Sequence, residues 1–296
     1  MPELPEVETV VRGLRERIIG EVITAVEIYW PRTVAGHAPA DLAAGLVGAA
    51  VTGVSRRGKY AVISLGERGC LLVHLRMTGR LLVEEPDEPE VRPSAEGADT
   101  DPPAWEGPAG LARHTRVLWR FASGRRLRFW DLRKFGRVLW APTPNEALAA
   151  LGPEPLAPDL TPAILGEMLH ARRRQLKPLL LDQHFIAGLG NIYVDETLWE
   201  ARIHPARRSD SLTDDEVARL HAAIVDVLRA AVRGRGTTLR DYRGADNLPG
   251  DYQRALAVYG REGHPCRRCG HAIERIVIGN RGTRLCPICQ ALPDGA

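Results

Sequence analysis

The chain of 296 residues is poor in aromatic residues, at 5%, and it contains three methionines and five cysteines. It has no apolar run near the roughly 18 residues that a membrane-spanning helix needs. Its start, MPELPEVETV, lacks the basic and apolar regions of a secretory signal. We therefore expect a cytoplasmic protein with reduced thiols. The length and a hydrophobic content of 44% allow two ordinary domains, each with its own core.

Lysine is scarce, because Lys59, Lys134 and Lys177 are the three lysines among 40 basic residues. Arginine stays protonated whereas lysine can give up a proton, so these positions are candidates for a site that needs an amine. The net charge is +3, but residues 84–108 hold nine acids and one Arg. The remainder is basic enough to seek a polyanion, although a solvated basic surface would look the same. The acidic segment also holds six prolines, which predicts a loosely held loop.

The periodicity of apolar residues predicts an α+β protein. Val7, Val10, Val11 and Leu14 have the spacing of a helix with one buried face. Short β-rich runs predict an antiparallel sandwich, and they lie at residues 21–30, 59–65, 70–77, 116–122 and 126–133. Helical patterns follow at residues 162–170, 176–183, 191–200 and 213–233. We predict an N-terminal domain over 1–140, a linker over 141–158, a helical domain over 159–255 and a metal-binding finger over 256–290.

Four cysteines have the spacing of a zinc site, since Cys266, Cys269, Cys286 and Cys289 form two C-x2-C pairs separated by sixteen residues. Four thiolates leave no open position for water, so the predicted Zn²⁺ is structural. Two disulfides are the alternative, which a reducing compartment disfavours. The spacer reads as two short strands joined by a GNRG turn, which would present Arg281 to a phosphate. Cys70 lies in an apolar strand and is expected in the core.

The N-terminus is a candidate nucleophile. Met1 precedes the small residue Pro2, so removal of the initiator methionine would expose a secondary amine. An α-amino group titrates near roughly 7.7–8.0, against about 10.4 for lysine, so much more of it is unprotonated at neutral pH. Attack on a sugar C1′ would expel the base and leave an iminium ion, which acidifies the adjacent carbon and permits strand elimination. Glu3 is placed to move the protons.

Eight ordered motifs resemble those of bacterial formamidopyrimidine-DNA glycosylases over nearly the whole chain. They are PELPEVE (2–8), RGKY (57–60), HLRMTG (74–79), DLRKFG (131–136), KPLLLDQ (177–183), GLGNIYVDE (188–196), VYGREGHPCRRCG (258–270) and RGTRLCPICQ (281–290). The resemblance implies an N-terminal β-sandwich that begins with a helix, a helix-two-turn-helix domain and a zinc finger, with DNA in the cleft between the domains. It implies a monomeric DNA glycosylase and AP lyase of base excision repair, associated with the nucleoid. Its partner would be double-stranded DNA containing oxidised purines or abasic sites.

The resemblance also assigns catalytic roles. It makes Pro2 the residue that forms the Schiff base and Glu3 the proton donor in base excision, with Glu6 supporting the pocket. Lys59 would donate the proton of β-elimination. Arg281 would serve δ-elimination while holding the phosphates beside the lesion; because an arginine gives up its proton reluctantly, the phosphate role is the stronger one.

Further positions match DNA-contacting residues of the family, namely His114, Arg133, Arg172 and Asn191. Met77, Arg133 and Phe135 match the trio that fills the space left by the extruded nucleotide. Lys177 matches a lysine near the damaged base, and residues 237–253 match the loop that folds over 8-oxoguanine. Arg116 departs from the pattern, since many relatives carry a second histidine there.

Two other functions remain open from the sequence. An endonuclease VIII-like enzyme would prefer oxidised pyrimidines, but such chains usually begin PEGPE and shorten the recognition loop, whereas this chain has Leu4 and a full-length loop. A non-enzymatic zinc-finger protein that binds damaged DNA would leave the N-terminal string unexplained.

Overall fold

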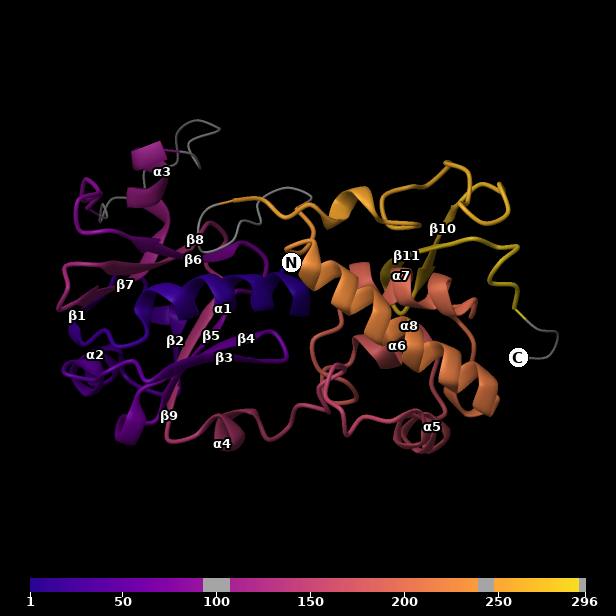
Figure 1. Ribbon diagram of the computed structural model, residues 1–296, viewed down its shortest axis with the longest axis horizontal. Coiled ribbons are helices and arrows are strands. Elements are labelled where there is room, and N and C mark those ends of the chain that lie inside the picture. The colour runs from indigo at the N-terminus through magenta and orange to yellow at the C-terminus, as the bar shows by residue number, and fades with distance from the viewer. Residues whose placement is uncertain (93–106, 239–247, 293–296) are drawn as a thin grey trace. The chain divides into compact units, whose positions relative to one another are not determined.

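The computed structural model describes residues 1–92, 107–238 and 248–292 (Figure 1). The chain forms two compact units. The first comprises residues 1–2, 6–149 and 237–250, and the second comprises residues 3–5, 150–236 and 251–296. The predicted α+β class is confirmed, and the boundary after Ala149 falls inside the segment that we predicted as a linker.

The helices and strands are divided between the two units as follows. The first unit contains α1 (Leu4–Ile18, from its third residue on), β1 (Ile23–Ile28), β2 (Val34–Ala35), α2 (Pro39–Leu46), β3 (Gly53–Arg57), β4 (Tyr60–Ser64), β5 (Cys70–His74), β6 (Gly79–Glu84), α3 (Gly107–His114), β7 (Thr115–Phe121), β8 (Arg126–Asp131), β9 (Arg137–Ala141) and α4 (Pro144–Leu148). The second contains α5 (Pro162–His170), α6 (Leu176–Leu181), α7 (Asn191–Ala201), α8 (Asp214–Arg233), β10 (Glu274–Ile278) and β11 (Arg281–Leu285).

The first unit is built on two sheets. One has the strand order β1-β7-β8-β6 and is antiparallel, and the other has the order β2-β9-β5-β4-β3. The predicted antiparallel sandwich holds except at β2, which pairs with β9 in parallel. Helix α1 buries the predicted apolar face, including Val7, Val11 and Leu14, in the same core as Trp119 and Phe129 of the sheets. Packing in this core fixes the orientation of α1, the helix that follows the N-terminal residues.

The outer face of the four-stranded sheet binds the start of the acidic segment. Glu84 ends β6 as a buried residue, and its carboxylate accepts hydrogen bonds from Arg126 Nε at 2.8 Å and from Arg128 Nε at 2.5 Å. The Arg128 guanidinium also donates to the carbonyl of Val91 at 2.9 Å. The prediction of a loosely held loop over 84–108 is therefore wrong for its first residues, because arginines of β8 hold them on the sheet. Residues 93–106 of that segment lie outside the described residues.

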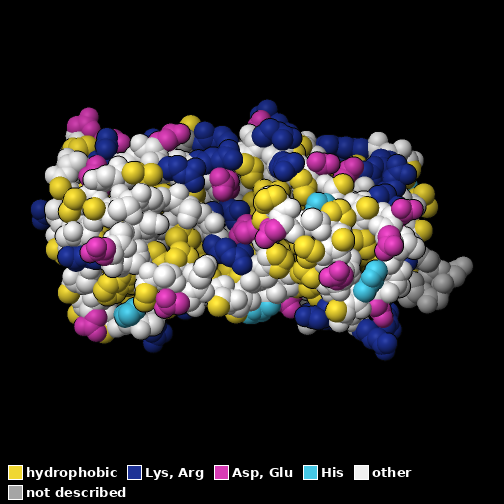
Figure 2. Space-filling view, turned by 60° about the horizontal axis from the view of Figure 1, so that its bottom comes forward, with side chains coloured by type: hydrophobic (Ala, Val, Ile, Leu, Met, Phe, Trp, Pro, Cys, Tyr) yellow, Lys and Arg dark blue, Asp and Glu magenta, His cyan; other side chains and the backbone are white. Residues whose placement is uncertain are grey.

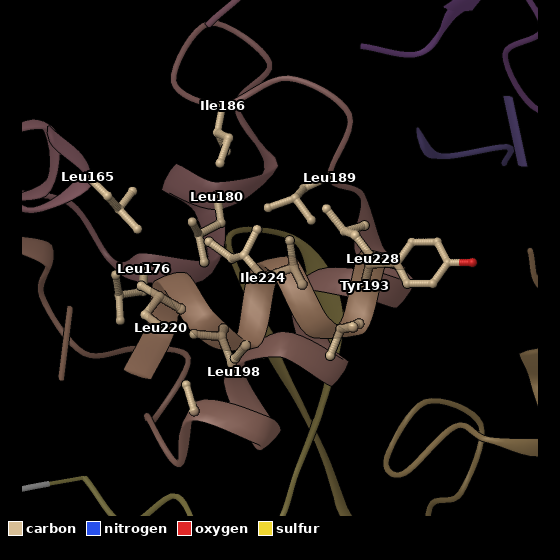
Figure 3. Close-up of a cluster of buried hydrophobic side chains, with 14 of the residues drawn as sticks. Leu165, Leu176, Leu180, Ile186, Leu189, Tyr193, Leu198, Leu220, Ile224 and Leu228 are labelled. Atoms are coloured by element: carbon tan, nitrogen blue, oxygen red, sulfur yellow. The ribbon is translucent and has the colours of Figure 1, made fainter. Parts of the chain in front are cut away.

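The second unit has a helical core. Leucines of α5, α6, α7 and α8 pack together with Ile186, Leu189 and Ile224 (Figure 3). Helix α8 begins at a capping box in which Thr213 Oγ1 accepts from Glu216 N while the Glu216 carboxylate accepts from Thr213 N. Helix α7 is buried along nearly its whole length, including Asp195 and Glu196. An acidic pair inside a helical core needs polar partners, and these come from Lys177 of α6 and from the finger described below.

Strands β10 and β11 form the hairpin of the predicted finger. Ile278 pairs with Arg281, so the turn consists of Gly279 and Asn280, whose φ angles are 55° and 59°. Left-handed φ at both central residues is the geometry of a tight two-residue hairpin turn, and Gly and Asn are the residues that adopt it most readily. Arg281 is thus the first residue of β11, beside the tip rather than on it, and its side chain is exposed.

The molecular surface carries both signs of charge. On the face drawn in Figure 2, Arg and Lys side chains lie beside Asp and Glu side chains, so positive charge is not gathered into one patch on that face. Among the described residues, no helix combines the length and the apolar character needed to cross a bilayer.

Candidate active site and metal centre

The Glu3 side chain lies at the N-terminus of α7. Its Oε1 accepts from Ile192 N at 3.0 Å and its Oε2 from Tyr193 N at 3.3 Å, and the residue is 2% exposed. Both donors belong to the first turn of the helix, whose N–H groups have no partner within the helix and favour negative charge. Glu3 is therefore held in place by a helix that begins almost 190 positions later.

The GLGN motif makes this contact possible. A Cβ on Gly190 would lie 2.3 Å from the Glu3 carboxyl carbon, so a larger residue would displace the carboxylate. Gly188 adopts a φ of 91°, and a Cβ there would lie 2.7 Å from Leu4 Cδ1. The carbonyl of Gly188 also accepts from Leu4 N at 3.0 Å. These glycines are needed because the N-terminal chain approaches their backbone closely.

Glu6 binds the beginning of the segment that we predicted as a recognition loop. Its Oε1 accepts from Thr237 N at 2.7 Å, and Glu6 is 1% exposed. The two described ends of the loop are also joined, since Gly250 N donates to Thr238 Oγ1 at 2.8 Å. The part of the predicted loop at 239–247 lies outside the described residues. A buried carboxylate one turn along α1 from the N-terminus thus fixes where this loop starts.

Pro2 and Lys59 both belong to the first unit. Pro2 follows the exposed Met1 and lies two residues before the start of α1. Lys59 lies in the two-residue turn between β3 and β4, after Gly58 with a φ of 56°, and it is 5% exposed. Glu3 and Arg281 belong to the second unit. The four predicted catalytic residues are thus divided evenly between the units.

The predicted trio of Met77, Arg133 and Phe135 comes together on the first unit. Arg133 Nη1 donates to Met77 Sδ at 3.0 Å, and the Arg133 guanidinium lies 4.7 Å from the centre of the Phe135 ring. Met77 and Phe135 are 43% and 47% exposed, so they are not ordinary core residues. Two exposed apolar side chains around one guanidinium have the composition of a wedge that enters a base stack.

Asp131 holds the two loops that carry this trio. Its Oδ2 accepts from Gly136 N at 2.7 Å, and its Oδ1 accepts from Thr78 Oγ1 and from Arg133 N. Thr78 Oγ1 in turn accepts from Arg133 N at 3.0 Å. Asp131 is fully buried, so these bonds are shielded from water. The HLRMTG and DLRKFG motifs therefore form one rigid structure.

His114 and Arg172, which we predicted to contact DNA, lie on different units. His114 ends α3 with its ring edge-on to Trp130. Burial and the neighbouring Arg116 lower the pKa of His114 to about 4, so its imidazole is neutral at physiological pH. Arg116, the departure from the family pattern, is buried and donates to the carbonyl of Asp131 at 2.8 Å. Arg172 follows α5 and is exposed.

The four predicted zinc ligands form one cluster whose sulfur atoms all lie within 4.8 Å of one another. Cys269 and Cys286 have their sulfurs 3.4 Å apart, and Cys266 and Cys289 have theirs 3.9 Å apart. Sulfurs around a tetrahedral Zn²⁺ with bonds of about 2.3 Å would be separated by about 3.8 Å, whereas a disulfide bond measures about 2.05 Å. The four thiols therefore fit one structural Zn²⁺ and not two disulfides. Cys70 is buried in β5, away from this cluster, as predicted.

Trp199 of α7 is a neighbour of the metal ligands. Its indole Nε1 donates to Cys266 Sγ at 3.5 Å, and the Arg268 guanidinium lies 3.7 Å from the centre of its ring. Glu196, one turn earlier in α7, accepts from the backbone N–H groups of Ala257, Val258 and Tyr259. These contacts attach the finger to the helix whose N-terminus binds Glu3.

Lys177 and Asn191 both bind the hairpin that carries Arg281. Lys177 Nζ and Asn191 Nδ2 donate to the carbonyl of Gly282 at 3.0 and 3.2 Å. Lys177 is fully buried, and its ammonium also lies 2.6 Å from Asp195 Oδ1. These two residues, which we predicted to contact DNA, therefore both bind the backbone of Gly282, the residue next to Arg281.

Comparison with known proteins identifies the family. Residues 1–138 match the formamidopyrimidine-DNA glycosylase N-terminal domain, residues 151–242 match the H2TH domain of the same enzymes, and residues 263–292 match the zinc finger found in FPG and IleRS. The chain belongs to the formamidopyrimidine-DNA glycosylase family. It is accordingly a DNA glycosylase of base excision repair with a structural zinc finger, and the predicted H2TH domain is confirmed.

Relatives of this family match along the whole chain. The formamidopyrimidine-DNA glycosylase of Herpetosiphon aurantiacus is 45% identical over 98% of this chain and 100% of its own length. That of Symbiobacterium thermophilum is 45% identical over 100% of this chain and 91% of its own length. Among solved structures, a Lactococcus lactis FPG mutant bound to Fapy-dG containing DNA is 36% identical, covers 98% of this chain and has a TM-score of 0.85. A complex of the Lactococcus lactis enzyme with abasic-site DNA has a TM-score of 0.84.

Sequence reasoning missed Asp195 and Glu196, the buried acids that attach this family's finger to α7. A signal was available, because two adjacent acids interrupt a stretch that is otherwise mostly apolar, NIYVDETLW. Acids in a helix with apolar residues on every side indicate buried charge that requires partners. The sequence alone did not say which residues those partners would be.

Proposed function

We propose that this chain excises oxidised purines from DNA, including 8-oxoguanine and formamidopyrimidines, and then cleaves the strand at the abasic site. The main support is the full-length similarity to glycosylases solved with Fapy-dG, 8-oxo-G and abasic-site DNA. The clamp on Glu3 supports the same proposal, since it fixes an acid next to the N-terminal proline. The family comparisons do not favour the pyrimidine-specific alternative. As a repair enzyme it would act as a monomer on the nucleoid, in the cytoplasm.

The proposed reaction starts at the nitrogen of Pro2, after removal of Met1. The amine attacks C1′ of the damaged nucleotide, the glycosidic bond breaks, and the Glu3 carboxylate passes the proton that the amine loses to the departing base. The ring oxygen takes a proton from water as the sugar opens. Opening of the sugar ring leaves an iminium ion between Pro2 and C1′. A proton is then lost from C2′, the C3′–O bond breaks, and the 3′ strand leaves as a phosphate, with Lys59 supplying the proton that this step needs. Elimination at C5′ releases the second phosphate, and water then frees the amine.

The remaining site residues hold the substrate. His114, Arg172, Asn191 and Arg281 would bind backbone phosphates, and His114 would do so as a neutral donor because of its lowered pKa. Met77 and Phe135 would fill the space left by the flipped nucleotide, with Arg133 facing the orphaned cytosine. Residues 237–253 would cover the extruded base, starting from the Thr237 backbone that Glu6 binds. The proposed functions would be divided among the predicted N-terminal domain (1–140), helical domain (159–255) and finger (256–290), with the linker at 141–158.

Borohydride trapping tests the covalent step. The processed protein should form a reduced adduct with duplex DNA that contains 8-oxoguanine opposite cytosine, and mass spectrometry should place the link on Pro2. Pro2→Gly should reduce trapping strongly. An adduct on any other residue would refute the mechanism.

Glu3→Gln separates the two activities. This variant should lose base release yet still cleave preformed abasic sites, because Glu3 is needed only for the departing base. Glu8→Gln is the matched control, since Glu8 is a nearby acid in α1 that pairs with Arg12 and Arg56 instead of the α7 N-terminus. Release of thymine glycol faster than 8-oxoguanine would favour the pyrimidine-specific alternative.

A further inference from the structure

The carbonyl of Gly282 is an unusual point of convergence in the finger. Lys177 Nζ, Asn191 Nδ2 and Arg284 Nη1 all direct a donor at this oxygen, at 3.0, 3.2 and 3.4 Å. A carbonyl oxygen has two lone pairs, so three donors saturate it. Gly282 is the residue after Arg281, so hydrogen bonds to its carbonyl restrain the position of the backbone from which the Arg281 side chain extends.

A buried ion pair fixes the strongest of these donors. The Lys177 and Asp195 side chains are both 0% exposed, and their charged atoms are 2.6 Å apart. Asp195 Oδ2 also accepts from Arg284 N at 3.0 Å, so the same carboxylate holds a second residue of β11. A buried charge requires such partners, because desolvation otherwise costs several kcal/mol. Lys177 is thereby committed to the hairpin and has no surface to offer to DNA.

The neighbouring residue Pro178 packs against Gly279, two residues before Arg281. A Cβ on Gly279 would lie 2.8 Å from Pro178 Cγ, so the hairpin turn packs directly against α6. Pro178 thus contacts the residue two positions before Arg281, and Lys177 binds the residue directly after it. Contacts on both sides of Arg281 restrain the hairpin backbone, and this limits the directions that the Arg281 side chain can take.

We propose that Lys177 is a positioning residue for Arg281, acting through the Gly282 carbonyl with Asp195 as its counter-ion. This inference rests on the proposed function of Arg281 in holding phosphates during strand cleavage. It gives Lys177 a role in the reaction without contact with the damaged base. Arginine would not substitute, because a planar guanidinium is larger than the ammonium that this closed site encloses.

A double-mutant cycle tests the proposal in the full zinc-loaded chain. Lys177→Met and Asp195→Asn are combined, so that no uncompensated charge stays buried, and this pair is made in the wild-type and Arg281→Ala backgrounds. Cleavage of abasic-site DNA and the ratio of δ- to β-elimination products are measured. Misplacement of a functional group by about 1 Å can cost up to a hundredfold, so we expect cleavage to fall roughly ten- to a hundredfold in the wild-type background.

The Arg281→Ala background decides the outcome. If Lys177 acts through Arg281, the paired substitution should change neither rate nor product ratio further once Arg281 is gone. An equal loss in both backgrounds, or an unchanged product ratio in the wild-type background, would overturn the proposal.

Controls separate this result from misfolding and from failure of the proposed function. Arg207→Met with Glu216→Gln removes a different ion pair of the same unit, whose side chains are 11% and 19% exposed. This control should leave the product ratio unchanged. Zinc content and melting temperature show whether each variant is folded. If the wild-type chain itself forms no borohydride adduct, the proposed function fails; if it does and the cycle is additive, the positioning role alone fails.

Discussion

The ion cluster on the four-stranded sheet makes a quantitative prediction about stability. Glu84 is the shared carboxylate of Arg126 and Arg128, and the three side chains are 10%, 7% and 0% exposed. Glu84→Gln keeps the size of the side chain but takes the carboxylate away from two buried guanidiniums, which have no other ion-pair partner among the described residues. Breaking a buried pair from one side costs about 3–5 kcal/mol, so we expect the free energy of unfolding to fall by about that amount.

A matched pair of the same acidic segment sets the comparison. Glu90 binds Arg120, with side chains that are 29% and 31% exposed, and Arg120 keeps Glu27 as a second partner. Exposed pairs contribute about 0.2–1 kcal/mol, so Glu90→Gln should have a small effect. Salt at 1 M shortens the screening length to about 3 Å, and it should remove the effect of Glu90→Gln while leaving that of Glu84→Gln.

Urea unfolding monitored by circular dichroism measures both variants. Lower midpoints with an unchanged slope indicate a change in stability rather than in the area exposed on unfolding. Equal destabilisation by the two substitutions, or a loss for Glu84→Gln that disappears in 1 M salt, would refute the view that burial makes this cluster important.

Three further perturbations have defined outcomes. Burial lowers the pKa of His74 to about 3, whereas in the unfolded chain the imidazole takes up a proton near pH 6.5. The free energy of unfolding should therefore be full above pH 6.5 and about 2 kcal/mol lower at pH 5. His74→Asn should flatten this pH dependence in urea titrations. Trp199→Phe removes the hydrogen bond to Cys266, so zinc should pass to a chelator roughly tenfold more readily; unchanged retention would exclude a contribution of the indole. Glu6→Ala removes the carboxylate that accepts from Thr237 N, and it should slow excision of 8-oxoguanine more than cleavage of preformed abasic sites. Equal slowing of the two reactions would contradict a role specific to the loop.

The sequence predicted the elements whose signals are local. The helix predicted at 162–170 coincides with α5, whose start is marked by Pro162 and by the Thr161 side chain, which accepts from Ile164 N. The zinc cluster was predicted because cysteine spacing sets which thiols can meet. Strands β2, β3, β6 and β9 were not predicted. VA is too short and GVSRR too polar to show a strand pattern. Their pairing with neighbouring strands decides their conformation.

Contacts between distant parts of the chain were beyond the reach of residue patterns. The catalytic string at the N-terminus was visible, but its attachment to Ile192 and Tyr193 depends on the path of the whole chain. Glu84 was assigned to a loose acidic loop because net charge counts acids without their partners. The arginines that bind it lie more than 40 positions away, and they make the same residue part of a strand.

Helix α7 explains why the catalytic and zinc-binding motifs belong to one fold. Its first turn binds Glu3, its middle carries the acids that hold the finger, and Trp199 reaches a zinc ligand. A four-residue advance along a helix returns to the same face, so Asp195 and Trp199 both face the finger from one rigid element. Loss of zinc should therefore disturb the hairpin of Arg281 first, whereas Glu3 depends on backbone N–H groups that the helix presents by itself. The proposed strand cleavage should therefore depend on the zinc finger more than the proposed base release does.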